Sequence, residues 1–224
     1  MSRRIVDLTL AISESMPTFS APWHPVVEIR QLGHHGIENR ETRRLVIGTH
    51  TGTHVDAPLH FIENGKTIDQ IPLDILVGPA NIIDLTWADD SHEVSKDELF
   101  EAIAGRDVTR LILKYGWDSK IGSDSYFKDH AFLSESACHY LVSEGCLLLG
   151  MDTAQPDNPL NCKGSENDAP NHKILLENGV ILVEYLVNLE LLRKTAVELV
   201  VAPLKISGGD GAPARCFAIE NYDD

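Results

Sequence analysis

The stretch Gly48–His60 reads GTHTGTHVDAPLH and carries three histidines and one aspartate, at positions 50, 54, 56 and 60. The spacing of His50 and His54 would place both rings on one face of a helix, as in HExxH zinc sites. Gly52, Pro58 and the β-branched neighbours disfavour a helix. We therefore predict a bent, extended segment, in which side chains at even positions point to the same side. Gly52 permits unusual dihedral angles there, and Pro58 indicates a bend or a strand edge.

This segment has the chemistry of a metal site. Neutral imidazoles and a carboxylate are ligands of Zn²⁺, and also of Mn²⁺ or Fe²⁺. Three such ligands leave coordination positions free for water and substrate, which is typical of a catalytic site. The alternative is a polar surface loop rich in threonine and glycine, and a lone histidine would favour it. Three histidines and an aspartate within eleven residues, all at even positions, favour a metal site over a surface loop.

Composition narrows the class of protein. The chain has 224 residues, of which 43% are hydrophobic and 24% charged, as in ordinary globular proteins. With 19 basic and 34 acidic residues the net charge is −15, which argues against nucleic-acid and membrane-surface partners. The four cysteines form no CxxC pair, so a disulfide framework or thiolate zinc site is not expected. No signal peptide or membrane-spanning stretch is evident, and we expect a cytoplasmic protein.

The order of the predicted elements indicates a single α/β domain with a mixed sheet, over residues 1–224. Helices are expected at 95–104, where Ser95 and Glu98 form a capping box, at 134–143 and at 171–177. Strands are expected at 5–10, 26–31, 43–47, 81–85, 109–114, 146–151, 180–183, 198–202 and 215–219. No GxGxxG or P-loop motif occurs. The glycine-rich stretch Gly208–Gly211 is expected to be a flexible turn, and Asp152 either a partner of a site residue or a loop cap.

The segment His50–His60 fills every position of the pattern HxGTHxDxPxH. In this it resembles the cyclase family of metal-dependent hydrolases, which includes bacterial kynurenine formamidase and isatin hydrolase. The similarity continues through 61–69 and reappears at 149–152 and 202–205. The resemblance implies a swivelling β/β/α fold and hydrolysis of an amide bond.

The resemblance also implies roles for individual residues. His50, His54 and Asp56 would bind a first metal, and Asp56 would bridge to a second ion. A histidine and a glutamate twelve residues apart hold that second ion in the family, and His172 and Glu184 have this spacing. His60 would be the proton donor and acceptor. The metal would be one or two Zn²⁺, or alternatively a single Mn²⁺.

The distal pair can also be weighed from the residues alone. Glu184 lies in the apolar run 180–187, where a carboxylate is rarely buried unless it is paired or bound to a cation. The alternative is a solvent-facing edge position. His172 stands at a predicted helix start, where a lone histidine is more often a surface residue.

Specificity is expected to come from the loop 16–25. Phe19 in this loop could stack on an aryl ring. Trp23 and Phe61 are further candidates for the aromatic wall, although both are equally compatible with core packing. Kynurenine formamidases place a tryptophan at about the position of Phe19. His24 is a further candidate for the pocket.

Three functions follow as hypotheses. The first is an arylformamidase that converts N-formylkynurenine to kynurenine and formate in tryptophan breakdown. The second is the opening of a cyclic amide such as isatin. The third is a metal-holding binding protein without turnover, which the presence of His60 disfavours. The substrate would be a small aromatic amide, and a homo-oligomer, a dimer or a tetramer, is expected.

Overall fold

The computed structural model describes residues 2–161 and 164–222. The strands of the main sheet are β1 (Ser2–Asp7), β4 (His54–Asp56), β5 (Val77–Asp84), β7 (Arg110–Lys114), β9 (Leu148–Met151), β10 (Ile181–Glu184), β11 (Ala196–Pro203) and β12 (Gly211–Tyr222). Two small sheets are formed by β2 (Glu28–Gly33) with β3 (Thr42–Val46), and by β6 (Glu93–Val94) with β8 (Phe132–Leu133). The α-helices are α1 (Leu73–Leu76), α2 (Lys96–Ile103), α3 (Ser125–Lys128), α4 (Glu135–Ser143) and α5 (Pro170–Glu177). Four 3-10 helices are η1 (Pro58–His60), η2 (Ile68–Gln70), η3 (Trp117–Lys120) and η4 (Leu189–Leu191).

The main sheet is mixed and closes on itself. Its strand order is β1-β12-β11-β5-β7-β9-β10-β4, and β4 pairs in turn with the start of β12. The strands β5, β7, β9 and β10 run parallel to one another, whereas β4, β11, β12 and β1 pair antiparallel with their neighbours. The mixed sheet of an α/β domain is thus as expected.

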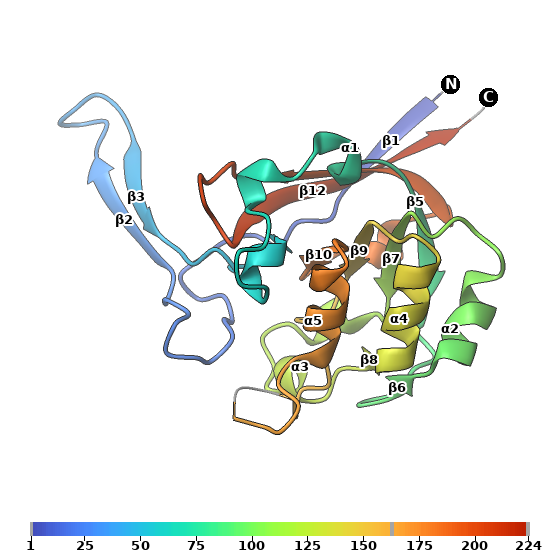
Figure 1. Ribbon diagram of the computed structural model, residues 1–224. Coiled ribbons are helices and arrows are strands. Elements are labelled where there is room, and N and C mark those ends of the chain that lie inside the picture. The colour runs from blue at the N-terminus through green and yellow to red at the C-terminus, as the bar shows by residue number, and fades with distance from the viewer. Residues whose placement is uncertain (1, 162–163, 223–224) are drawn as a thin grey trace.

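Alternate residues of the central strands pack into two separate cores. Leu111 and Leu113 of β7 and Leu182 of β10 belong to the core that also takes in residues of α2, α4 and α5. Ile112 and Val183 face the other core, enclosed by the closed sheet. Helices α2, α4 and α5 lie side by side on one side of the sheet (Figure 1). Parallel strands covered by helices explain the apolar run that marks β9 in the sequence.

Most expected elements are present, with shifted ends. The capping box is formed as predicted, with Ser95 accepting from the Glu98 amide and the Glu98 carboxylate accepting from the Ser95 amide. Asp152 is a loop cap, because it is fully buried and accepts hydrogen bonds from the amides of residues 115, 116 and 117. Cys138, Cys146 and Cys216 are free and buried, and Cys162 lies outside the described residues.

The hairpin β2–β3 projects away from the sheet (Figure 1). Several of its apolar side chains are exposed, among them Leu32, Ile37 and Leu45. Among the described residues, no helix combines the length and apolar character that crossing a bilayer requires.

Candidate metal centre

The centre of the site is the pairing of β4 with β10. These strands are antiparallel, and the register places Glu184 opposite His54 and Leu182 opposite Asp56. Because alternate residues of a strand share a face, His54, Asp56 and Glu184 project to the same side of the sheet. All three are at most 4% exposed. The solvent-facing alternative for Glu184 is therefore wrong.

The segment 48–60 is less extended than predicted. Only His54–Asp56 is a strand, His50 lies in a turn, and Pro58–His60 forms η1. Gly52 has φ +61, the left-handed conformation that its sequence position predicts. The chain bends at the turn that contains His50 and again at η1, and these bends bring together the side chains of His50, His54, Asp56 and His60. Alternation along a single strand does not account for it.

Helix α5 supplies a second imidazole from the opposite side of the site. The Nε2 atom of His172 lies 3.4 Å from Asp56 Oδ2 and 3.2 Å from Glu184 Oε1. The Nε2 atom of His54 lies 3.2 Å from Asp56 Oδ1 and 3.4 Å from Glu184 Oε2. Each carboxylate therefore turns one oxygen toward each imidazole.

These distances fit a cation. Ligand atoms placed tetrahedrally at about 2.0 Å from an ion are about 3.3 Å from one another. His54 Nε2, Asp56 Oδ2 and Glu184 Oε1 are buried and have no hydrogen-bond partner among the described residues. The ligand atoms of His54, Asp56 and Glu184 form one group close enough to share an ion, and those of His50, Asp56 and His60 form another. Buried nitrogen and oxygen atoms without a hydrogen-bond partner are the expected ligands of a metal site.

The electrostatics also favour a cation. Burial opposes the ionisation of Asp56, but the charges of His50 and His60 outweigh it and hold the pKa of Asp56 well below its ordinary value. Burial and the charge of Asp56 raise the pKa of Glu184. A cation between the two carboxylates would relieve both the desolvation and the mutual repulsion.

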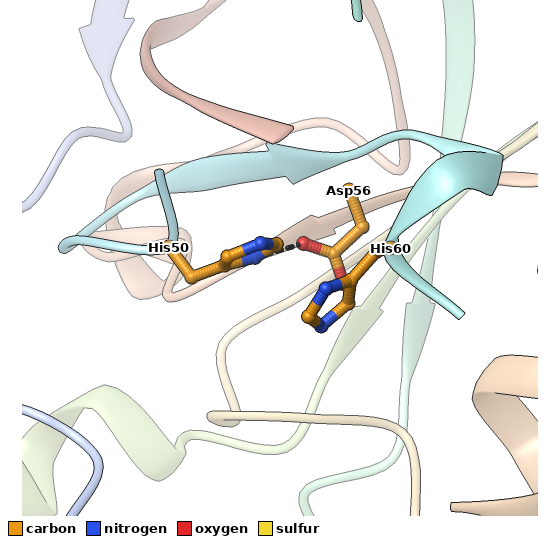
Figure 2. Close-up of side chains that lie close together, drawn as sticks. All are labelled: His50, Asp56 and His60. Carbon is orange, nitrogen blue, oxygen red and sulfur yellow. Dashed lines mark hydrogen bonds and ion pairs between the residues drawn. The ribbon is translucent and has the colours of Figure 1, made fainter. Parts of the chain in front are cut away.

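A third carboxylate, Asp210, organises the outer histidines. Its Oδ2 atom is 2.7 Å from His50 Nε2 and 3.5 Å from His60 Nδ1. His50 Nδ1 is 2.7 Å from Asp56 Oδ1, the contact drawn in Figure 2, where His60 lies close beside the same carboxylate. Burial lowers the pKa of His50, but the charge of Asp56 and hydrogen bonds to Asp210 and Asp56 outweigh it and raise this pKa to about 10.

A cavity of about 950 Å³ opens onto this centre. Its lining includes His50, His54, His60, His172 and Glu184. The three predicted aromatic residues, Phe19, Trp23 and Phe61, and the further candidate His24 also line it. The structure thus brings every predicted site residue to one cavity or into contact with its lining, since Asp56 contacts His50, His54 and His172.

Sequence reasoning missed two acidic residues. Asp210 lies in the stretch predicted to be only a flexible turn, and its position is fixed because its backbone oxygen accepts a hydrogen bond from Ala57 N. Asp157 is fully buried, with Oδ2 2.5 Å from His172 Nδ1. An aspartate between glycines was the only available signal for Asp210, and nothing in the sequence around Asp157 distinguishes it.

Comparison with known proteins shows the family of this chain. Residues 6–158 match the family model Cyclase, described as "Putative cyclase". The chain belongs to the cyclase family. A member from Salinibacter ruber (strain DSM 13855 / M31), named kynurenine formamidase, is 36% identical over 172 residues, which are 76% of each chain. Another kynurenine formamidase, from Bacillus thuringiensis subsp. konkukian (strain 97-27), is 33% identical over 77% of each chain.

A solved structure extends the similarity to nearly the whole chain. The crystal structure of an isatin hydrolase bound to the product analogue thioisatinate has a TM-score of 0.86 and 26% identity, covering 98% of this chain and 93% of that one. The expected cyclase-like fold is thereby confirmed. The domain span 1–224 and the roles of the individual site residues stay predictions.

Proposed function

We propose that this protein is a metal-dependent hydrolase of aryl amides, and an arylformamidase that converts N-formylkynurenine to kynurenine and formate. The observation that carries the proposal is a set of two imidazoles and two carboxylates beside an aromatic cavity, in which the buried atoms His54 Nε2, Asp56 Oδ2 and Glu184 Oε1 have no hydrogen-bond partner among the described residues. Relatives named kynurenine formamidase, at up to 36% identity, support the substrate class.

His54, His172, Asp56 and Glu184 would hold the metal, with His50 as a further ligand beside Asp56. Each carboxylate offers one oxygen to each histidine, so these residues would hold one or two ions. Imidazole and carboxylate ligands favour Zn²⁺, with Mn²⁺ as the alternative. The bound cation would supply Lewis acidity, which lowers the pKa of water and stabilises negative charge on a carbonyl oxygen.

His60 would exchange the proton that the reaction requires. Hydrolysis breaks the amide C–N bond, and the leaving nitrogen must gain a proton. With the proton of Nδ1 directed toward Asp210, His60 can move a second proton at Nε2. His60 lines the cavity and is more exposed than His54 or His172. It can therefore reach a substrate without giving up its contact with Asp210.

The aromatic residues of the cavity would bind the aryl ring. Phe19 packs edge-on against His24, with ring centroids 5.7 Å apart, and Phe61 lies 4.6 Å from the His172 ring. Such a wall orients an aryl amide by stacking and excludes water from the reacting carbonyl.

The second candidate is the opening of a cyclic amide, supported by the structural similarity to isatin hydrolase. Purified protein should be assayed with N-formylkynurenine and with isatin, each with and without a chelator. Chelator-sensitive hydrolysis of formylkynurenine supports the first proposal, and hydrolysis of isatin alone supports the second. Metal uptake without hydrolysis of either compound would leave only a binding protein.

We also propose a homo-oligomer, a dimer or a tetramer, in the cytoplasm. The exposed apolar side chains of the β2–β3 hairpin, such as Ile37 at 75% exposure, support self-association. The free, buried thiols suit a reducing compartment. Light scattering coupled to gel filtration tests the first statement, and a monomer at micromolar concentration would reject it.

A further inference from the structure

Asp157 lies behind the metal centre and does not belong to the cavity lining. It follows β9, is fully buried, and contacts the start of α5 at three points. Its Oδ1 atom accepts a hydrogen bond from Asn171 N at 2.6 Å, and its Oδ2 atom accepts one from His172 N at 3.1 Å. The same Oδ2 atom lies 2.5 Å from His172 Nδ1.

The backbone contacts make Asp157 the cap of α5. The residue at the cap position, Ala169, has φ 46 and offers no side-chain cap. Asp157, reaching across from another segment, satisfies two of the amides that a helix start leaves without partners. The Asn171 side chain adds hydrogen bonds to Leu133 O at 2.6 Å and Pro156 O at 2.9 Å, so this end of the helix is tied to the segment that carries Asp157.

The side-chain contact determines which nitrogen of His172 carries a proton. The Oδ2 atom of Asp157 already accepts a hydrogen bond from His172 N, and a carboxylate oxygen acts as an acceptor, so Nδ1 is placed to donate to it. Nε2 then faces oxygens of Asp56 and Glu184, where it would offer its lone pair to a bound cation. Because one oxygen holds both the backbone and the ring of His172, the ring has little freedom to turn away.

The other imidazole of the centre is held differently. His54 Nδ1 lies 2.8 Å from the backbone oxygen of Gly52. Its orientation therefore does not depend on Asp157. Only the half of the centre that contains His172 relies on this aspartate.

We propose that Asp157 is a positioning residue that fixes His172 as the Nδ1–H tautomer and thereby controls the affinity of the His172 half of the centre for its cation. This inference rests on the proposed function, since it assigns the centre to a metal. It adds a residue that contacts neither the cation nor the substrate.

The test compares Asp157→Asn with the wild type in the zinc-loaded protein. The asparagine oxygen can still accept a backbone hydrogen bond, but its NH₂ group favours an unprotonated Nδ1 and moves the ring proton to Nε2. Asp152→Asn is the matched control, because Asp152 is equally buried and accepts three backbone hydrogen bonds but none from a histidine.

Two readouts do not depend on activity. Long-range ¹H–¹⁵N correlation spectra should show His172 protonated at Nδ1 in the wild type and in Asp152→Asn. Competition with a chromogenic chelator should show zinc affinity about 10- to 100-fold lower in Asp157→Asn, with Asp152→Asn unchanged. Wild-type His172 protonated at Nε2 overturns the inference without any variant, as does an Asp157→Asn protein that keeps its zinc affinity within twofold.

Failure of the proposed function gives a different result. A wild type that binds zinc with His172 protonated at Nδ1, and that loses affinity on Asp157→Asn, supports the positioning role even when neither formylkynurenine nor isatin is hydrolysed. Conversely, if the protein hydrolyses the substrate but Asp157→Asn leaves its zinc affinity unchanged, the proposed function stands and the inference is overturned.

Discussion

The imidazole rings of His50 and His60 are stacked, with centroids 3.8 Å apart and planes inclined by 30°. Ten residues separate them in sequence, and both turn a nitrogen toward the same oxygen of Asp210. Both rings line the cavity, and His50 also contacts Asp56. In the proposed function, the proton-transfer group His60 therefore lies directly beside the metal ligand His50.

Replacing His60 by alanine should separate these two roles. We expect kcat for the aryl amide to fall about 10²- to 10⁴-fold, the usual contribution of a general acid–base group. Zinc content should stay at the wild-type level, because His54, His172, Asp56 and Glu184 are unchanged. Steady-state kinetics and elemental analysis by mass spectrometry measure the two effects.

The control for His60 is His139→Ala, on the exposed side of α4. It should change neither kcat nor zinc content. Full activity in His60→Ala would remove its role in proton transfer. Loss of zinc in that variant would instead make His60 a ligand, as its membership of the group with His50 and Asp56 allows.

Gly211 is required by the close approach of β12 to the site. A Cβ atom at this position would lie 2.6 Å from Val55 O and 2.9 Å from His50 Cε1. Because the first contact is with backbone, β4 itself must shift, and β4 carries His54 and Asp56. We expect Gly211→Ala to destabilise the protein by about 1–3 kcal/mol and to weaken zinc binding.

Urea denaturation and chelator competition test this prediction. Gly36→Ala is the control, since a Cβ atom there meets nothing within 4 Å and the residue is in the projecting hairpin. The prediction is wrong if Gly211→Ala keeps the stability and zinc affinity of the wild type. β12 and β4 could then move apart without loss of stability.

Much of the fold follows from sequence pattern, because the helices have clear signals. The capping box of Ser95 and Glu98 is local and lies where the sequence places it, and the helix expected at 134–143 begins after its Ser134 cap. The short elements, such as α1 and the 3-10 helix η1, had no such capping signal, and neither has a side-chain cap in the structure. η1 is held by contacts within its loop, as when Leu59 N donates a hydrogen bond to Lys66 O.

The site was predictable in part, for a related reason. His50, His54 and Asp56 are close in sequence, so their convergence needs only local bends. Asp210 and Asp157 reach the histidines from 160 and 15 residues away, respectively, and the closure of the sheet and the start of α5 bring them there. These contacts cannot be predicted from one sequence, because they form only when the fold brings distant segments together.

Removing the metal should destabilise the folded chain. Without a cation, the Asp56 and Glu184 carboxylates stay buried and partly unpartnered. At a free zinc concentration of about 100 times Kd, binding stabilises the folded state by about 2.7 kcal/mol. For a domain of this size, that corresponds to a melting temperature lower by about 5–10 °C after chelation.

Differential scanning fluorimetry before and after chelation measures this shift, and added Zn²⁺ or Mn²⁺ should restore it. His54→Ala serves as the control, because a protein that no longer binds the ion should show little change in melting temperature on chelation. An equal shift in the wild type and in His54→Ala would place the stabilising ion elsewhere.

His130 should make the protein sensitive to acid independently of the metal. It is fully buried, its Nδ1 atom lies 3.1 Å from Ala131 O, and its Nε2 atom has no hydrogen-bond partner among the described residues. Burial lowers its pKa to about 4. The unfolded chain therefore binds a proton near pH 6.5 that the folded chain does not accept until about pH 4.

The stabilising contribution of neutral His130 is thus complete above pH 6.5 and is lost as the pH falls toward 4. Integrated over this window, the loss amounts to about 3 kcal/mol, at 1.36 kcal/mol per pKa unit. The variant His130→Asn keeps a donor near Ala131 O but cannot titrate. Urea denaturation of both proteins between pH 7.5 and 4.5 should show the wild type losing stability faster, by up to this amount.

Metal release on acidification affects both proteins equally, since ligand protonation competes with metal binding in each. The difference between the two stability curves therefore isolates His130, and any constant offset from repacking leaves its slope unchanged. Parallel curves over this pH range would mean that water or a rearranged neighbour solvates the imidazolium, and that the ring is less isolated than its burial indicates.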